Sequence, residues 1–170
     1  HGDPASEHFM SEVSAVEPLV GKRNVSVETM FEYGSRAGFW RLYRLLTSKN
    51  IPVTIYGVSM ALERNPEAVA AMKEADWEIA SHGLRWIDYQ TMTPKEERSQ
   101  LLEAIKIHTR ATGSRPLGWF TGRGTEHTQS LVAEEGGFAY CSDSYADDLP
   151  YWERKWENPL LIIPYCLDNN

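Results

Sequence analysis

The chain has 170 residues, of which 42% are hydrophobic and 24% are charged. This size and composition are typical of one soluble globular domain with a substantial core. A formal net charge of −7 argues against nucleic acid as a partner, because phosphate binding needs a basic surface. The sequence contains no apolar run near the roughly 18 residues that a membrane helix requires, so we expect no membrane partner.

Strand-like and helix-like segments alternate along most of the chain. We predict strands over residues 24–28, 52–58, 77–80, 117–120, 138–141 and 160–165. We predict helices over residues 38–49, 66–74, 93–112 and 125–135. The third helix opens with Thr93-Pro94-Lys95-Glu96, a capping-box pattern with proline at the first helical position. This alternation indicates an α/β fold with right-handed βαβ units and a mainly parallel sheet or barrel.

The chain reads as one unit, because it contains no internal repeat or low-complexity tract. We therefore predict a single domain over residues 1–170. Residues 1–22 have no clear strand, and residues 168–170 directly follow a predicted strand end, where functional loops usually begin. We accordingly expect the chain to be the middle of a longer protein, whose closed barrel needs at least one more strand at the front.

His82 follows the predicted strand at 77–80 and should lie at its C-terminal end. In α/β folds this edge of the sheet collects functional groups. A zinc or iron site would need a second imidazole or a carboxylate about one turn further on. Position 86 is instead a tryptophan, which is not a metal ligand, so we expect a site for a polar substrate without a firmly held ion. The alternative for His82 is a hydrogen-bonded core histidine.

Polar and aromatic residues also lie within or next to the other predicted strands. The candidates are Glu32, Arg36, Arg85, Trp86, Arg115, Trp119, Arg123, Asp143, Asp147, Asp148, Trp152 and Asp168. Strand ends that meet on one rim would form a polar pocket with aromatic walls. The arginines suit planar, bidentate binding of an amide or carboxylate, although a lone arginine is usually an ordinary surface residue. We expect Asp143 to orient the histidine or a water molecule, and one aspartate of the 147–148 pair to lie in a solvated turn.

Taken together, these segments resemble the polysaccharide deacetylase superfamily, carbohydrate esterase family 4. The matching motifs are Ser81-His82-Gly83-x-Arg85-Trp86, Arg115-Pro116-x-Gly118-Trp119-x-Thr121-Gly122-Arg123, Ser142-Asp143-Ser144 with Asp147-Asp148-Leu149-Pro150-x-Trp152, and Ile163-Pro164-Tyr165-x-Leu167-Asp168. The segments Glu32-Tyr33-Gly34-Ser35-Arg36 and His1-Gly2-Asp3-Pro4 are similar to the metal-independent allantoinase branch of that superfamily. The resemblance implies a deformed (β/α) barrel with an active-site groove at the C-terminal ends of the strands.

The resemblance also implies a hydrolase of non-peptide C–N bonds, and we predict an allantoinase that converts allantoin to allantoate without a cofactor. His82 or Asp143 would act as the base or orient the water, while Arg85 and Arg123 would hold the ureido carbonyls. Trp86 and Trp119 would wall the flat ring, with the remaining candidates binding the substrate.

Two alternatives remain open. The first is a chitin or polysaccharide N-deacetylase that uses a divalent metal such as zinc, held in that family by an aspartate and two histidines spaced HxxxH. The second is a non-catalytic sugar-binding relative. The partner would be a cyclic ureide or an N-acetylated sugar. We expect a cytoplasmic protein, or a secreted one if it is a chitin deacetylase, that associates into a homo-oligomer.

Overall fold

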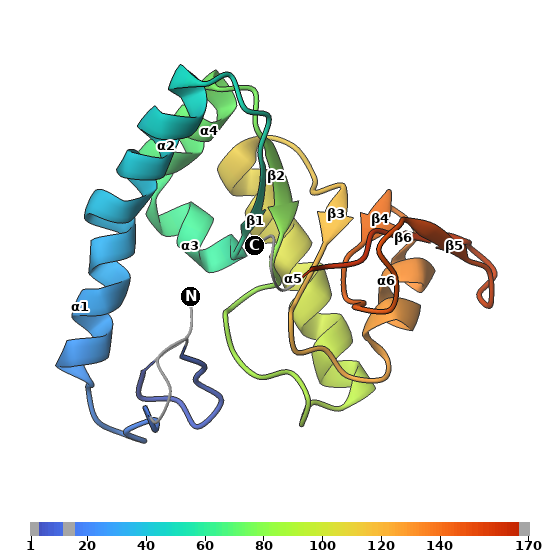
Figure 1. Cartoon of the computed structure of the whole chain (residues 1–170). Coiled ribbons are helices and arrows are strands. Elements are labelled where there is room, and N and C mark those ends of the chain that lie inside the picture. Colours follow the sequence, from blue (N-terminus) through green and yellow to red (C-terminus); the bar gives the residue numbers. More distant parts are fainter. Residues whose placement is uncertain (1–3, 12–15, 167–170) are drawn as a thin grey trace.

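A six-stranded sheet runs through the computed structural model, which describes residues 4–11 and 16–166 (Figure 1). Its strands, in spatial order, are β1 (Thr54–Gly57), β2 (Glu78–Ser81), β3 (Gly118–Trp119), β4 (Tyr140–Cys141), β6 (Leu160–Ile162) and β5 (Tyr151–Glu153). Neighbouring strands are parallel except β5, which pairs antiparallel with β6. The C-terminal ends of five parallel strands therefore lie at one edge of the sheet.

Six α-helices and one π-helix accompany the sheet in the described residues. They are α1 (Val25–Tyr33), the π-helix η1 (Gly34–Gly38), α2 (Phe39–Ser48), α3 (Ser59–Arg64), α4 (Pro66–Glu74), α5 (Pro94–Thr112) and α6 (Thr128–Glu135). The first three follow one another without a break and form a long helical rod beside the sheet (Figure 1). No helix in the part of the chain that the structure describes has the length and apolar character needed to cross a membrane.

The long helix α5 confirms the capping pattern read from the sequence. The Thr93 hydroxyl accepts the Glu96 amide at 3.3 Å, and the Glu96 carboxylate accepts the Thr93 amide at 2.8 Å. Gly113 ends the helix with φ of 87°, a left-handed conformation that glycine adopts at little cost. The segment was predictable because both of its ends carry local signals that need no tertiary contact.

The predicted strand at residues 24–28 is wrong, because this segment begins α1. The Asn24 side chain accepts the Val27 amide at 3.3 Å and caps the helix. Five alternating residues are too few to separate a strand from the first helical turn, and an N-terminal asparagine suits both readings. The helix α3 and the edge strand β5 were not predicted.

The core lies where helices pack against the sheet. Residues of α5 and α6 form one cluster with the strands β3, β4 and β6: Leu101, Ala104, Trp119, Leu131, Val132, Ala133, Cys141, Leu160 and Ile162. A second cluster joins α3 and α4 to Trp77, with partly buried residues of α2, β1 and β2 packed against it. Burial of these apolar side chains fixes the sheet and leaves its C-terminal edge to polar groups.

A polar contact crosses β3 on the sheet. Tyr140 of β4 donates its hydroxyl to Glu78 of β2 at 3.0 Å, and Thr54 of β1 donates to the same carboxylate at 2.8 Å. The tyrosine ring passes over Gly118, where a Cβ atom would overlap the ring. Gly118 is therefore required by this close approach and not by its own backbone conformation.

Candidate functional site

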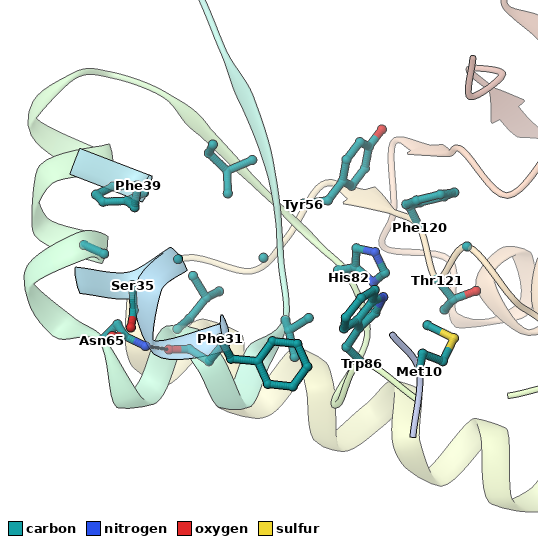
Figure 2. A pocket seen from close by; sticks show the side chains of 18 of the residues that line it. Met10, Phe31, Ser35, Phe39, Tyr56, Asn65, His82, Trp86, Phe120 and Thr121 are labelled. Atoms are coloured by element: carbon teal, nitrogen blue, oxygen red, sulfur yellow. Dashed lines mark hydrogen bonds between the residues drawn. The ribbon is translucent and has the colours of Figure 1, made fainter. Parts of the chain in front are cut away.

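A cavity of about 1020 Å³ runs along β1 and reaches the residues that follow β2 and β3. Figure 2 shows Ser35, Phe39 and Asn65 toward one end of this cavity, and His82 and Phe120 toward the other. The first end is contributed by η1, α2 and the α3–α4 region. The second end lies at the C-terminal edge of the sheet, where the sequence predicted the site.

His82 follows β2 directly and is half-buried in the cavity wall. Its backbone amide donates to the Gly57 carbonyl at 2.9 Å, which ties it to the end of β1. Its ring meets Phe120 edge-on, with centroids 5.2 Å apart. Burial lowers the pKa of His82 below its ordinary value of 6.5, because desolvation disfavours the imidazolium. The neutral ring at pH 7 is therefore able to accept a proton from a water molecule.

The turn after His82 is fixed from behind by a tyrosine that the sequence analysis missed. Tyr89 is 1% exposed, and its hydroxyl accepts the Leu84 amide at 3.2 Å. Burial raises the pKa of Tyr89 to about 12, so the phenol stays neutral. Gly83 has φ of +71° and lies against this hydroxyl. This contact orients the segment that brings Trp86 to the cavity. Tyr89 was not predicted, because no local sequence motif distinguishes it.

Aromatic side chains wall the cavity beside His82. Phe120 stacks on Tyr165 with centroids 4.3 Å apart and planes at 9°, and Tyr145 meets Tyr165 edge-on at 5.8 Å. Trp86 lines the same cavity, as the sequence analysis expected, and meets Phe31 edge-on at 6.1 Å. An aromatic wall was predicted, but most of its members were not.

The expected role of Trp119 in this wall is wrong. Its side chain is fully buried in the core cluster below the sheet edge and meets Phe138 edge-on at 5.4 Å. Successive residues of a strand point to opposite faces, so Phe120 and not Trp119 reaches the cavity. The strand was predicted correctly, but the wrong one of two neighbouring aromatic residues was assigned to the cavity wall.

Asp143 makes a different contact from the expected one. Its carboxylate accepts the Thr121 amide and hydroxyl at 3.0 Å and the Gly122 amide at 2.9 Å. These bonds direct it to the loop after β3 and not to His82. Burial, the largest influence, raises the pKa of Asp143 to about 6 against these hydrogen bonds. The carboxylate lines a second cavity, of about 630 Å³.

Arg123 lies where the two cavities meet, since it lines both of them together with Gly122 and Tyr145. Its side chain is 57% exposed, and a guanidinium nitrogen lies 4.0 Å from an Asp88 carboxylate oxygen. This long ion pair leaves guanidinium N–H groups able to donate to a ligand. Of the predicted arginines in the described residues, Arg123 is the one that lines these two cavities.

Arg115 lies away from this site, contrary to expectation. It pairs with Glu135 at 2.8 Å and covers the Phe138 ring at 5.4 Å. Residue 115 precedes β3, whereas Arg123 follows it, so the two arginines flank opposite ends of that strand. The sequence motif that joins them does not show this separation.

Several other candidates lie outside the lining of both cavities. Glu32 and Arg36 form an exposed ion pair at 3.7 Å on the helical rod. They do not lie at the sheet edge, because a helix and not a strand precedes them. Arg85 is half-buried in the turn after His82. Three further candidates are exposed to solvent: Asp147 and Asp148 lie in the turn before β5, and Trp152 lies on that edge strand. Asp168 and residues 1–3 fall outside the described residues.

A metal centre does not fit the described residues by themselves. In residues 4–11 and 16–166, no group of three histidine, cysteine, aspartate or glutamate side chains is placed to hold an ion. Among the residues that the structure describes, His82 is the single side chain of these four types in the lining of the main cavity, and the Trp86 indole lies in the same wall. We therefore derive no chemical step through a metal.

Several known proteins are similar to this chain in sequence and fold. Residues 21–140 match the polysaccharide deacetylase family. A crystal structure of a provisionally named polysaccharide deacetylase from Pseudomonas aeruginosa PAO1 has 54% identity and a TM-score of 0.90, over 95% of this chain and 55% of that one. The crystal structure of Puue allantoinase has 54% identity and a TM-score of 0.88, over 92% of this chain and 52% of that one.

A curated Schizosaccharomyces pombe protein, provisionally named a polysaccharide deacetylase, is 35% identical over 99% of this chain and 58% of its own length. The chain thus spans a little over half the length of these relatives. The mostly parallel α/β sheet shared with the two crystal structures confirms the predicted fold class, a deformed barrel; in the described residues the sheet is open, with β1 and β5 at its edges.

Proposed function

The chain belongs to the polysaccharide deacetylase family, and from this premise we propose that the protein is a hydrolase of C–N bonds other than peptide bonds. More narrowly, it would open the cyclic amide of allantoin to give allantoate. The observation that supports this substrate is the 54% identity to Puue allantoinase over 92% of the chain. A neutral imidazole in an aromatic-walled cavity is compatible with this chemistry.

In the proposed reaction His82 acts as the general base. It takes a proton from water while the water oxygen attacks a ring carbonyl carbon, and Arg123 donates hydrogen bonds to the developing oxyanion. The imidazolium then returns the proton to the ring nitrogen as the C–N bond breaks. Asp143 is a poorer candidate for the base, because its oxygens already accept bonds from Thr121 and Gly122.

The aromatic wall would bind the flat ring of a cyclic ureide. Phe120 and Trp86 both line the end of the cavity that holds His82. Apolar faces exclude water around the ring, and the few polar groups then fix its orientation. Exclusion of water also strengthens the hydrogen bonds to the oxyanion.

A second candidate is deacetylation of an N-acetylated saccharide. It is favoured by the provisional names of two relatives and by the cavity, whose volume of about 1020 Å³ is at the upper end for small-molecule sites. Such a reaction would need a metal, for which residues outside those described would have to supply ligands.

The deciding experiment assays the full-length protein on allantoin and on chitin oligosaccharides, each with and without EDTA. Allantoate formation that survives the chelator supports our proposal. Acetate release that EDTA abolishes supports the deacetylase, and binding without turnover of either substrate indicates the non-catalytic relative. A cofactor-free reaction, a homo-oligomeric state and a cytoplasmic location remain predictions.

A further inference from the structure

A fully buried carboxylate in the first turns of α5 has no part in the reaction described above. Glu97 is 1% exposed, and its two oxygens accept the hydroxyls of Thr125 and Thr128. Charged side chains are almost never fully buried unless they are paired. Both hydrogen-bond donors are neutral and both come from one loop, at the start of α6. Glu97 therefore joins a core helix to that loop.

The two hydroxyls pass this contact on to the loop backbone. The Thr125 oxygen accepts the His127 amide at 2.9 Å, and the Thr128 oxygen accepts the Thr125 amide at 2.8 Å. Each hydroxyl donates its proton to Glu97 and uses a lone pair to accept the backbone amide. One side chain thus sets the direction of all these hydrogen bonds.

Asp143 holds the other end of the same loop through the Thr121 and Gly122 amides. Glu97 holds Thr125 and Thr128. Arg123 lies between these two anchors, at the junction of the two cavities. Its own side chain is only loosely paired, so the backbone on either side sets the point from which the guanidinium reaches into the cavity.

We propose that Glu97 is a positioning residue, which together with Asp143 clamps the 121–128 loop and so holds Arg123 toward the cavity. The role of Arg123 in turnover rests on the proposed function, whereas the clamp itself does not. Glu97 was not predicted from the sequence, because a glutamate early in a helix is ordinarily a solvated residue that interacts favourably with the helix dipole.

Hydrogen exchange of the full-length protein tests the clamp without any substrate. Glu97→Gln keeps the size of the side chain but replaces one acceptor with a donor, which leaves one threonine hydroxyl misdirected. We expect exchange in the 121–128 segment to rise about tenfold or more. Thr125→Val removes the hydroxyl that accepts the His127 amide, so exchange should rise at that amide and less over the rest of the segment.

The matched control is His108→Gln. His108 is also 1% exposed and lies about three turns further along α5. This variant perturbs the same helix without touching the loop, so exchange in the 121–128 segment should stay as in the wild type. Equal exchange in the Glu97 and His108 variants, at equal global stability, would overturn the clamp.

A double-mutant cycle on kcat/KM tests whether the clamp acts through Arg123. Glu97→Gln should lower kcat/KM about tenfold in the wild type, since small misplacements of a catalytic group are costly. It should have less than about a twofold effect when Arg123 is already alanine, because a residue that acts through another is non-additive with it. Full additivity would refute the link to Arg123. If the wild type turns over neither substrate, the proposed function fails, while the exchange experiment still decides the clamp.

Discussion

Replacing Gly83 with alanine tests how the turn after His82 is built. The residue has φ of +71°, and a Cβ atom there would lie 2.6 Å from the hydroxyl oxygen and 3.3 Å from the Cζ atom of Tyr89. That hydroxyl cannot move away freely, because Tyr89 is buried and accepts the Leu84 amide. The substitution therefore has two separate costs, one from the backbone and one from the overlap.

The backbone cost of a side chain in the left-handed region is about 1–2 kcal/mol. Forcing an extra methyl group into a packed site adds about 1–3 kcal/mol. Gly83→Ala should therefore lower the free energy of unfolding by about 2–5 kcal/mol. Because the displaced turn carries His82 at its start, kcat/KM should fall as well.

Gly21→Ala is the matched control, since Gly21 also has φ of +71° but a Cβ atom there would meet nothing within 4 Å. It should lose about 1–2 kcal/mol, the backbone cost alone. Urea denaturation of both variants and the wild type measures the difference. Adding Tyr89→Phe to Gly83→Ala removes the overlapping oxygen and should cost less than the two single changes together. Equal losses in the Gly83 and Gly21 variants would refute the overlap.

Three other outcomes follow from the site. The kcat/KM of the wild type should rise with pH with an apparent pKa below 6.5, because burial favours the neutral ring of His82. A midpoint above 6.5, or the same pH profile in His82→Gln, would contradict the role of His82 as the base. Arg123→Ala should lower kcat by about 10²–10³ with an unchanged melting temperature, and near-wild-type turnover would remove Arg123 from the mechanism. Burial raises the pKa of Asp143 from 3.8 to about 6, so the folded protein binds this proton more tightly than the unfolded chain does. The resulting contribution to the free energy of unfolding is present below pH 3.8 and is lost as the pH rises through 6, by up to about 3 kcal/mol. In Asp143→Asn, the free energy of unfolding measured by urea denaturation should depend less on pH between about pH 4 and 7. An unchanged pH dependence would count against the raised pKa.

The sequence was most informative where a structure is specified by neighbouring residues. The ends of α5 are marked by Thr93 with Glu96 and by Gly113, so that helix was predicted correctly. The position of His82 after β2 followed in the same way from a short apolar run. Segments without clear local capping signals were less predictable. In residues 24–28 the alternation of polar and apolar residues suits a strand, but Asn24 caps a helix.

Contacts between distant segments could not be read from the sequence. Trp119 and Phe120 are adjacent aromatics, and only the packing of α5 and α6 decides which of them faces the core. Likewise, the partners of Asp143 are 21 and 22 residues away along the chain. The position of a residue after a predicted strand places it near one edge of the sheet, but it does not show which of these residues are in contact.

The crossing of β3 by Tyr140 links two positions that are far apart in the sequence. Residue 118 has no room for a side chain as long as a large ring occupies position 140 and reaches Glu78. Among homologues we expect these two sites to covary: a bulkier residue at 118 should occur only where 140 is small. A side chain added at position 118 alone would overlap the Tyr140 ring, whereas a smaller residue at 140 would leave Gly118 unaffected, so the constraint acts in one direction.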